Sequence, residues 1–170
     1  MTANAAQACA DLGLAHLVLN RPPWDAADAT VVATSEDAAA VVAERGYSRV
    51  FLTTGRSGVG AFRSARPWFL IRVVTAPDPA DLPADHELLL SRGPYRYDAE
   101  SRLLAGRAID VLVTKNSGGA LTRAKVDAAD ALGVDVVMID RPPLPDGITA
   151  VGSVGDAQRW LLGPDTAQPG

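Results

Sequence analysis

Short runs of Val, Ile and Leu alternate along the chain with alanine-rich segments, and this alternation constrains the fold more than any other feature. The apolar runs occupy residues 16–19, 30–34, 49–54, 68–74, 86–91, 110–114 and 135–139. Each run is nearly continuous in apolar character, which is typical of strands covered on both faces in a parallel sheet. Helical patterns occupy residues 2–12, 36–45, 98–108, 120–132 and 154–162. Ser35 and Ser153 stand where two of these helices need an N-cap. The order of the segments predicts an α/β fold with mainly parallel sheets.

The composition argues against several classes of protein. The chain has 170 residues, of which 48% are hydrophobic and 21% charged, a balance typical of a globular protein with a substantial core. No apolar run approaches the length of a membrane span, and no basic residue precedes Arg21, so neither a membrane anchor nor a signal peptide is expected. Cys9 is the single cysteine and only His16 and His86 are available beside it, so no metal site is expected. The net charge of −4 argues against nucleic acid as a partner. We therefore expect a cytoplasmic protein.

An internal repeat indicates two similar lobes. Residues 12–23, LGLAHLVLNRPP, align without a gap onto residues 132–143, LGVDVVMIDRPP, and an alanine-rich helical pattern precedes each copy. With a loop shift of one residue, Asp37 then falls on Asp156. Helix–strand units resemble one another by chance, but the shared Arg-Pro-Pro ending favours a real repeat. The repeat therefore predicts two similar α/β lobes.

The two copies differ in what precedes them. A strand and a glycine loop precede the helix of the second copy, whereas the chain begins inside the helix of the first. We therefore expect residues 1–46 to be the remnant of an N-terminal Rossmann-like lobe, 47–163 to form a C-terminal Rossmann-like lobe, and 164–170 to be a flexible tail. The first lobe is expected to be incomplete, as in an N-terminally shortened form of a longer protein. An incomplete sheet has an exposed edge, which predicts self-association.

Basic residues follow the ends of five predicted strands. They are Arg21, Arg56, Arg92, Lys115 and Arg141. The C-terminal ends of parallel strands share the edge of the sheet that holds the ligand. We therefore expect these side chains to gather at one edge and to bind an anionic ligand through its phosphate or carboxylate groups. Gly55 and Gly93 adjoin two of them and permit close backbone approach or unusual dihedral angles.

Residues 111–133, VLVTKNSGGALTRAKVDAADALG, combine a strand, a polar glycine loop and a helix. Such junctions bind anions because the loop amides and the helix N-terminus point at one spot. The candidate ligand-binding residues here are Lys115, Asn116, Ser117, Gly118 and Gly119. A short connector with a solvated lysine is the alternative. Lys125 in the helix is a further candidate, although a lysine whose stem lies on apolar surface and whose ammonium reaches solvent has the same pattern.

The sequence shows no Ser-His-Asp, Cys-His or paired-carboxylate constellation, so the catalytic residues remain unassigned. A chemistry that needs little from side chains, such as hydride transfer from a bound cofactor, fits this pattern. Tyr95 and Tyr97 are interpreted either as a platform for a flat ligand or as packing residues. The three tryptophans are interpreted as core or lobe-interface residues; they are Trp24, Trp68 and Trp160.

Five short motifs follow one another along the chain. They are TTGR at 53–56, RVV at 72–74, SRGP at 91–94, VTKNSGG at 113–119 and VVMIDRP at 136–142. In this order and at these spacings they resemble the precorrin-6A reductase family, and the resemblance extends over residues 2–162. It implies two Rossmann-like lobes, with NADPH and a polycarboxylated tetrapyrrole bound in the cleft between them. It also implies the reduction of one double bond of precorrin-6A, giving precorrin-6B in cobalamin biosynthesis.

The leading hypothesis is therefore an NADPH-dependent reductase. In it, Arg56, Arg92 and Lys115 neutralise the phosphates of the cofactor and the carboxylates of the substrate. The alternative is a catalytically inactive fragment, or a module of the same fold that binds a nucleotide or another anion. The resemblance fits both precorrin-6A and its cobalt-containing counterpart as the substrate.

Overall fold

The protein is described here in a computed structural model, which covers residues 2–25, 28–145 and 147–163. The α-helices are α1 (Thr2–Asp11), α2 (Ser35–Glu44), α3 (Tyr97–Gly106), α4 (Ala124–Leu132) and α5 (Val154–Leu162). The strands are β1 (Leu17–Leu19), β2 (Thr30–Val32), β3 (Arg49–Thr53), β4 (Trp68–Val73), β5 (His86–Leu90), β6 (Val111–Lys115), β7 (Asp135–Ile139) and β8 (Thr149–Val151). Three 3-10 helices complete the order: η1 (Arg56–Phe62), η2 (Pro79–Asp81) and η3 (Ala120–Thr122). All seven apolar runs form strands, and β8 is an additional strand that no long apolar run marks.

The chain divides into two compact units, which we call the larger and the smaller unit. The larger unit comprises Pro23–Arg141, and the smaller unit combines the chain up to Pro22 with the chain from Pro142 onward. Both crossings between the units therefore fall within the two Arg-Pro-Pro motifs. This division differs from the expected boundary between residues 46 and 47, because β2 and α2 are part of the larger unit.

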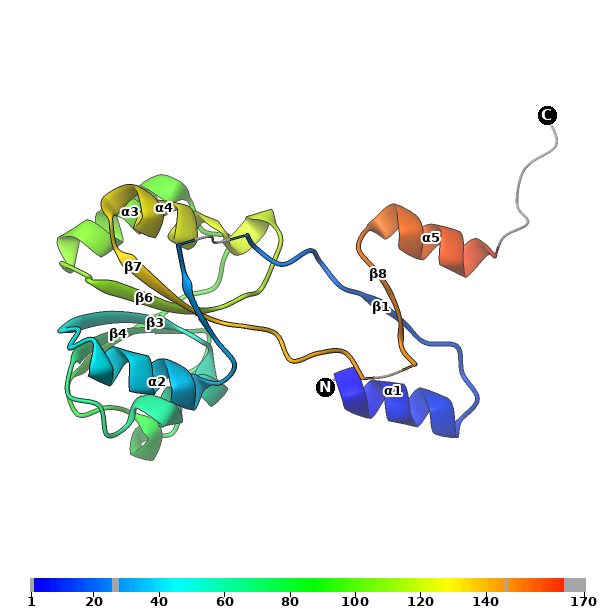
Figure 1. The fold of residues 1–170 in the computed structure, drawn as a ribbon, viewed down its shortest axis with the longest axis horizontal. Helices are drawn as coiled ribbons and strands as arrows, with labels where there is room; N and C mark the ends of the chain where they lie inside the picture. Colours follow the sequence, from blue (N-terminus) through cyan, green and yellow to red (C-terminus); the bar gives the residue numbers. More distant parts are fainter. Residues whose placement is uncertain (1, 26–27, 146, 164–170) are drawn as a thin grey trace. The chain divides into compact units, whose positions relative to one another are not determined.

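The larger unit is built on a six-stranded sheet with the strand order β2-β7-β6-β3-β4-β5 (Figure 1). All neighbouring strands in this sheet run parallel. The chain passes outward from β3 through β4 to β5, returns to β6 on the other side of β3, and continues outward to β7. The sheet is thus doubly wound, and its direction of winding reverses between β3 and β6. The predicted α/β fold with parallel sheets is confirmed.

Helices cover both faces of this sheet (Figure 1). Val50 and Leu52 of β3 belong to an apolar cluster with residues of α2 and η1. Phe51, between them, points to the opposite face and belongs to a cluster with residues of α3 and α4. A strand with apolar neighbours on both faces has no position for a solvated side chain, which explains why the strand segments are nearly continuous apolar runs.

The smaller unit holds a two-stranded parallel sheet of β1 and β8, together with α1 and α5. Leu17 pairs with Thr149, and Leu19 with Val151. No helix in the part of the chain that the structure describes is long and apolar enough to cross a membrane.

The repeat explains how the two units are connected. Each copy has the expected order of helix, strand, loop, strand and helix: α1, β1, β2 and α2 in the first, and α4, β7, β8 and α5 in the second. The first helix and strand of each copy lie in one unit, and the second strand and helix lie in the other. The two sheets are completed by pairing across the copies, since β2 pairs with β7 and β1 pairs with β8.

The second helix of each copy begins at a hydroxyl N-cap. Thr34 caps α2, because its side chain accepts a hydrogen bond from the Asp37 amide and the Asp37 carboxylate accepts one from the Thr34 amide. The prediction of Ser35 as this cap is wrong by one residue, since Thr34 has the extended backbone that an N-cap requires. Ser153 caps α5 as predicted, accepting a hydrogen bond from the Asp156 amide. Asp37 and Asp156 thus occupy equivalent positions, as the repeat predicts.

Candidate functional site

The reversal of winding between β3 and β6 defines the candidate site. In doubly wound sheets, ligands bind outside the C-terminal ends of the strands at the point where the strand order reverses. The chain leaves β3 here through Gly55 and Arg56, and it leaves β6 through the segment 115–119. We call these two segments the β3 loop (residues 54–58) and the β6 loop (residues 115–119).

The β3 loop is tightly constrained around two glycines. Gly55 has φ 78°, a left-handed conformation that favours glycine, and the chain continues directly into η1. A Cβ on Gly58 would lie 2.6 Å from the Thr54 hydroxyl oxygen, so the backbone here can approach Thr54 only because this residue is glycine. The Thr54 hydroxyl is itself buried and has no hydrogen-bond partner among the described residues. Gly55 and Arg56 were predicted from the sequence as ligand-binding residues, whereas Thr54 and Gly58 were not. The three-residue spacing between Gly55 and Gly58 is the feature of the sequence that could have indicated them.

The β6 loop makes an abrupt turn after the last strand residue. The Ser117 amide donates a hydrogen bond to the Lys115 carbonyl at 2.8 Å, and the Ser117 hydroxyl is 3.4 Å from the same oxygen. Gly118 and Gly119 both have positive φ angles, of 61° and 74°. Lys115 is partly buried at the end of β6, at the same edge of the sheet as the β3 loop. This arrangement fits the predicted anion-binding loop.

The Asn116 side chain, expected from the sequence to bind the ligand, contacts Trp24 in this structure. Its side-chain oxygen accepts a hydrogen bond from the Trp24 amide at 2.9 Å, and its side-chain nitrogen is 3.4 Å from the Trp24 carbonyl. Its own amide donates to the Ile139 carbonyl. One side-chain N–H and the backbone amide of Asn116 therefore have partners within the larger unit, and its side chain holds the segment around Trp24 against the β6 loop.

Arg141 also contacts the β6 loop. Its guanidinium Nε donates a hydrogen bond to the Asn116 carbonyl at 2.6 Å. The side chain is partly buried. In this position Arg141 supports the loop from the end of β7, the strand next to β6.

Lys125 is buried rather than extended toward solvent, so the alternative of a lysine with a solvated ammonium is wrong. Its Nζ donates a hydrogen bond to the Thr122 carbonyl at 2.9 Å and lies 4.9 Å from the centre of the Trp24 ring. Burial and the nearby Arg72 guanidinium lower the pKa of Lys125 to about 8, while the Glu100 carboxylate opposes this shift. The ammonium is held by a carbonyl and an aromatic face, which orders the start of α4 behind the β6 loop.

A buried ion pair lies in the same part of the larger unit and was not predicted. Arg72 of β4 donates two hydrogen bonds to the two carboxylate oxygens of Glu100 in α3, at 2.9 and 2.8 Å. Its guanidinium also lies over the rings of Phe51 and Tyr95. Tyr95 is thus a packing residue in this structure. A single arginine within the apolar segment 68–74 is the feature of the sequence that could have indicated a buried ion pair.

Arg92 and Gly93 follow β5, two strands away from β3 in the sheet. Arg92 is exposed, and the peptide bond between Gly93 and Pro94 is cis. A Cβ on Gly93 would lie 3.2 Å from the Tyr95 ring. Gly93 therefore allows the backbone to pass close to the tyrosine.

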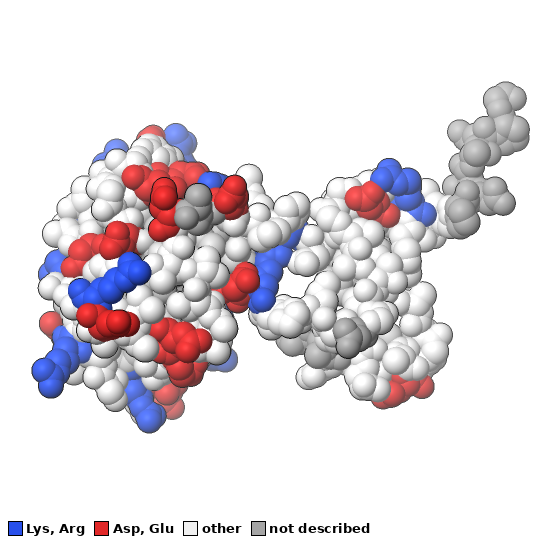
Figure 2. Space-filling view, viewed as in Figure 1, with Lys and Arg blue, Asp and Glu red and all other residues white. Residues whose placement is uncertain are grey.

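The expected ring of five cations is only partly present at one edge. Arg56, Arg92, Lys115 and Arg141 all follow strands of the six-stranded parallel sheet, so they lie at its C-terminal edge. Arg21 instead follows β1, and the expectation that it shares this edge is wrong because β1 belongs to the two-stranded sheet. Figure 2 shows that positive and negative side chains are mixed over the visible face of the larger unit. The candidate site therefore has four cations at the C-terminal edge of this sheet.

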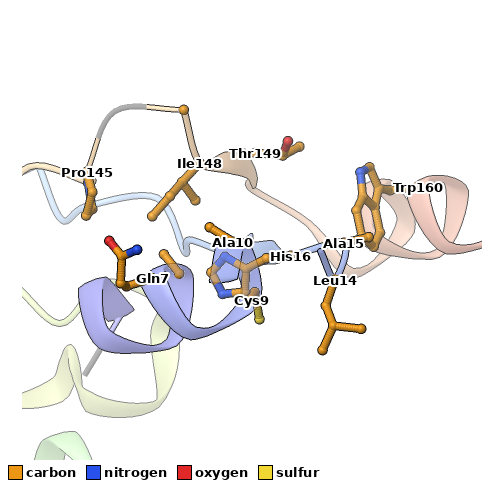
Figure 3. A pocket seen from close by; sticks show the side chains of 12 residues that line it. Gln7, Cys9, Ala10, Leu14, Ala15, His16, Pro145, Ile148, Thr149 and Trp160 are labelled. Carbon is orange, nitrogen blue, oxygen red and sulfur yellow. The ribbon is translucent and has the colours of Figure 1, made fainter. Parts of the chain in front are cut away.

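A separate pocket of about 570 Å³ lies within the smaller unit (Figure 3). Its lining includes Gln7, Cys9, His16, Ile148 and Trp160. None of the predicted ligand-binding residues is in this lining. Among the residues that the structure describes, no group of three or more His, Cys, Asp or Glu side chains is placed to hold a metal ion.

Comparisons with known proteins agree with this architecture. The family model of the precorrin-6x reductase CbiJ/CobK matches residues 1–162. The precorrin-6A reductase of Mycobacterium tuberculosis (strain ATCC 25618 / H37Rv) is 61% identical over 163 residues, covering 96% of this chain and 67% of that protein. The precorrin-6A reductase of Rhodococcus erythropolis is 46% identical over 165 residues, covering 95% of this chain and 66% of that protein.

A solved structure, described as CobK precorrin-6A reductase, has a similar fold. It matches with a TM-score of 0.86 and 35% sequence identity, covering 95% of this chain and 67% of that chain. The family model matches nearly the whole chain, and the two relatives are 61% and 46% identical over at least 95% of it. The chain therefore belongs to the precorrin-6x reductase CbiJ/CobK family.

Proposed function

We propose that this chain is a precorrin-6A reductase of cobalamin biosynthesis, which uses NADPH to reduce one double bond of precorrin-6A and gives precorrin-6B. The observation that carries the proposal is the 61% identity to the Mycobacterium tuberculosis precorrin-6A reductase over 96% of the chain. The matched region includes the β3 and β6 loops, which lie at the C-terminal edge of the six-stranded sheet.

The two loops fit a phosphate-bearing cofactor. Gly55, Gly118 and Gly119 give the backbone the left-handed turns that allow close approach to an anion. Arg56 and Lys115 stand on either side of the reversal of the sheet. NADPH carries its negative charge on phosphates, and each charge-assisted hydrogen bond to such a group contributes about 1.5–3 kcal/mol. The loops therefore bind and orient NADPH, which supplies the hydride when it is bound.

The acidic side chains of a tetrapyrrole need additional cations. Arg92, exposed beside the cis Gly93–Pro94 bond, is the next basic residue along the same edge, at the end of β5. Its guanidinium is suited to bidentate binding of a carboxylate. We assign it to the substrate for this reason, while Arg56 and Lys115 serve the cofactor.

Lys115→Ala tests the cofactor part of the proposal. Loss of one charge-assisted contact should weaken NADPH binding by tenfold or more, about 1.5–3 kcal/mol. The matched control is Arg66→Ala, because Arg66 is exposed and precedes β4, at the opposite edge of the sheet. Binding is measured by calorimetric titration with NADPH, and the thermal midpoint shows that both variants remain folded.

Turnover tests the reaction itself. Oxidation of NADPH in the presence of precorrin-6A is followed by absorbance, with the tetrapyrrole product identified by mass. Binding of NADPH without turnover would support the alternative of a binding module. No effect of Lys115→Ala on the affinity for NADPH or for precorrin-6A would show that Lys115 is a solvated connector residue and would contradict the proposed site.

A further inference from the structure

Trp24 is buried although it lies in the connection between β1 and β2, outside any helix or strand. Only 6% of its surface is exposed. It is the second residue of the larger unit, directly after Pro23, where the chain enters this unit. A large aromatic side chain in this position needs specific partners in the rest of the unit.

Those partners are both ends of the β6 loop. The indole Nε1 of Trp24 donates a hydrogen bond to the Gly119 carbonyl at 2.7 Å. Its amide donates to the Asn116 side-chain oxygen at 2.9 Å, and its carbonyl lies 3.4 Å from the Asn116 side-chain nitrogen. Trp24 therefore holds the loop near its start and at its end.

The same ring contacts the element behind the loop. The Lys125 Nζ lies 4.9 Å from the centre of the indole, and this ammonium also bonds to the Thr122 carbonyl. Val126 of α4 belongs to the same apolar cluster as Trp24. The loop, η3 and the first turn of α4 are thus tied to one residue, through its backbone at Asn116 and through its indole at Gly119 and Lys125.

The loop needs such support because of its own composition. Gly118 and Gly119 stand in succession with positive φ angles, and glycine has more conformational freedom to lose than any other residue. A loop that is ordered only when a ligand arrives binds more weakly than one already held in the competent form. The three hydrogen bonds to Trp24 restrict the loop before any ligand binds.

We propose that Trp24 is a positioning residue for the anion site: by holding Asn116 and Gly119 it keeps the β6 loop in the form in which Lys115 and the loop amides bind the cofactor. This inference rests on the proposed function and deepens it. Trp24 touches no reacting atom, and its effect passes through the loop.

The competing explanation is that Trp24 only fills space in the core. Trp24→Phe distinguishes the two, since it keeps an aromatic ring against α4 and removes the Nε1 donor to Gly119. We expect about three- to tenfold weaker NADPH binding, the size of the effect of one lost hydrogen bond. The matched control is Trp68→Phe, because Trp68 begins β4 at the opposite edge of the sheet and stacks on Arg49. This control should leave the affinity unchanged.

A double-mutant cycle with Lys115→Ala provides a readout that a purely structural role would not change. If Trp24 acts through the placement of Lys115, Trp24→Phe should have a smaller effect on affinity in the Lys115→Ala background than in the parent chain. Hydrogen exchange gives a second measurement without ligand: peptides covering 115–122 should exchange faster in Trp24→Phe and not in Trp68→Phe. Equal effects of Trp24→Phe in both backgrounds, or unchanged exchange of these peptides, would overturn the inference.

The outcomes separate this inference from the proposed function. If Lys115→Ala changes neither NADPH nor precorrin-6A affinity, the proposed site fails and the positioning role fails with it. If Lys115→Ala weakens binding but Trp24→Phe does not, the site stands and Trp24 is only a core residue.

Discussion

The larger and smaller units contain equivalent halves of the same repeat, yet their strands are covered to different extents. The buried apolar residues form two clusters, one on each face of the six-stranded sheet, and all of them lie between Trp24 and Ile139. In the smaller unit, none of the residues whose exposure the structure describes is buried, and Leu12, Leu161 and Leu162 are 72%, 73% and 66% exposed. Burial of apolar surface is the dominant favourable contribution to folding. We therefore expect the larger unit to supply most of the stability of the chain.

The candidate site lies in the more deeply buried of the two units. The β3 loop, the β6 loop, Trp24 and the buried Arg72–Glu100 pair all belong to the larger unit. A glycine-rich loop binds a ligand well only when the elements around it hold it in place. The covered six-stranded sheet provides that support at its C-terminal edge.

Truncation of the central core should produce the largest effect. Phe51 is fully buried in β3, so Phe51→Ala removes its packing and leaves a cavity, with an expected loss of about 3–5 kcal/mol in the free energy of unfolding. Leu161→Ala in α5 should change this free energy by no more than about 0.5 kcal/mol, because Leu161 is 73% exposed. Urea denaturation of both variants measures the difference. A similar loss in the two variants would contradict the unequal cover of the units.

Breaking the buried ion pair should have the next largest effect. Glu100→Gln leaves the Arg72 guanidinium buried without a charged partner, and we expect a loss of about 3 kcal/mol in the free energy of unfolding. Glu87→Gln is the matched control, since the Glu87–Arg107 pair is partly exposed, with about 40% of each side chain accessible. The control should lose at most about 1 kcal/mol. Urea denaturation at neutral pH measures the free energy of unfolding of both variants. Equal losses in the two variants would contradict a special contribution of the buried pair.

The sequence was sufficient for the elements but not for their pairing. The apolar runs 49–54 and 110–114 predict β3 and β6 closely, because a strand buried on both faces leaves a continuous apolar signal. β8 gives no such signal, since it has three residues and two of them are exposed. The division of the chain depends on whether β2 pairs with β7 or with β1. Three-residue strands do not specify their partners locally, which is why the boundary at residue 46 was expected.

The candidate site shows the same limit. Lys115, Gly118 and Gly119 could be proposed from the sequence as ligand-binding residues, because a basic residue and successive glycines at the end of a strand are typical of an anion-binding loop. The roles of Asn116 and Trp24 were not, because their hydrogen bonds join residues more than 90 positions apart in the chain. Such tertiary contacts leave no periodic pattern in the sequence.

The buried Lys125, in the larger unit, predicts that the free energy of unfolding depends on pH. Because folding lowers the pKa of Lys125 from 10.5 to about 8, the unfolded chain binds more protons between these values. The contribution of this group to stability therefore rises with pH from about 8 to 10.5, by at most about 1.4 kcal/mol per pH unit. Lys125→Met has no such group, so its stability relative to the parent chain should be highest near pH 7 and should fall toward pH 10. Urea denaturation of both chains across this range measures the difference, and a constant difference would show that Lys125 does not titrate as described.

The smallest expected effects come from the two equivalent N-caps, which compare the units directly. Thr34 and Ser153 each accept a hydrogen bond from the amide of an aspartate three residues later, so each Ala variant removes the same kind of bond, worth about 0.5–2 kcal/mol to its helix. Helix α2 packs Ala38 and Val42 into the core, whereas none of the residues of α5 is buried.

Thr34→Ala should therefore lower the free energy of global unfolding by about 1 kcal/mol. Ser153→Ala should leave global unfolding nearly unchanged and increase hydrogen exchange within α5, because an exposed helix opens locally before the core unfolds. Urea denaturation together with hydrogen exchange of peptides covering 35–44 and 154–162 makes the comparison, and equal losses of global stability would show that α5 is as firmly packed as α2.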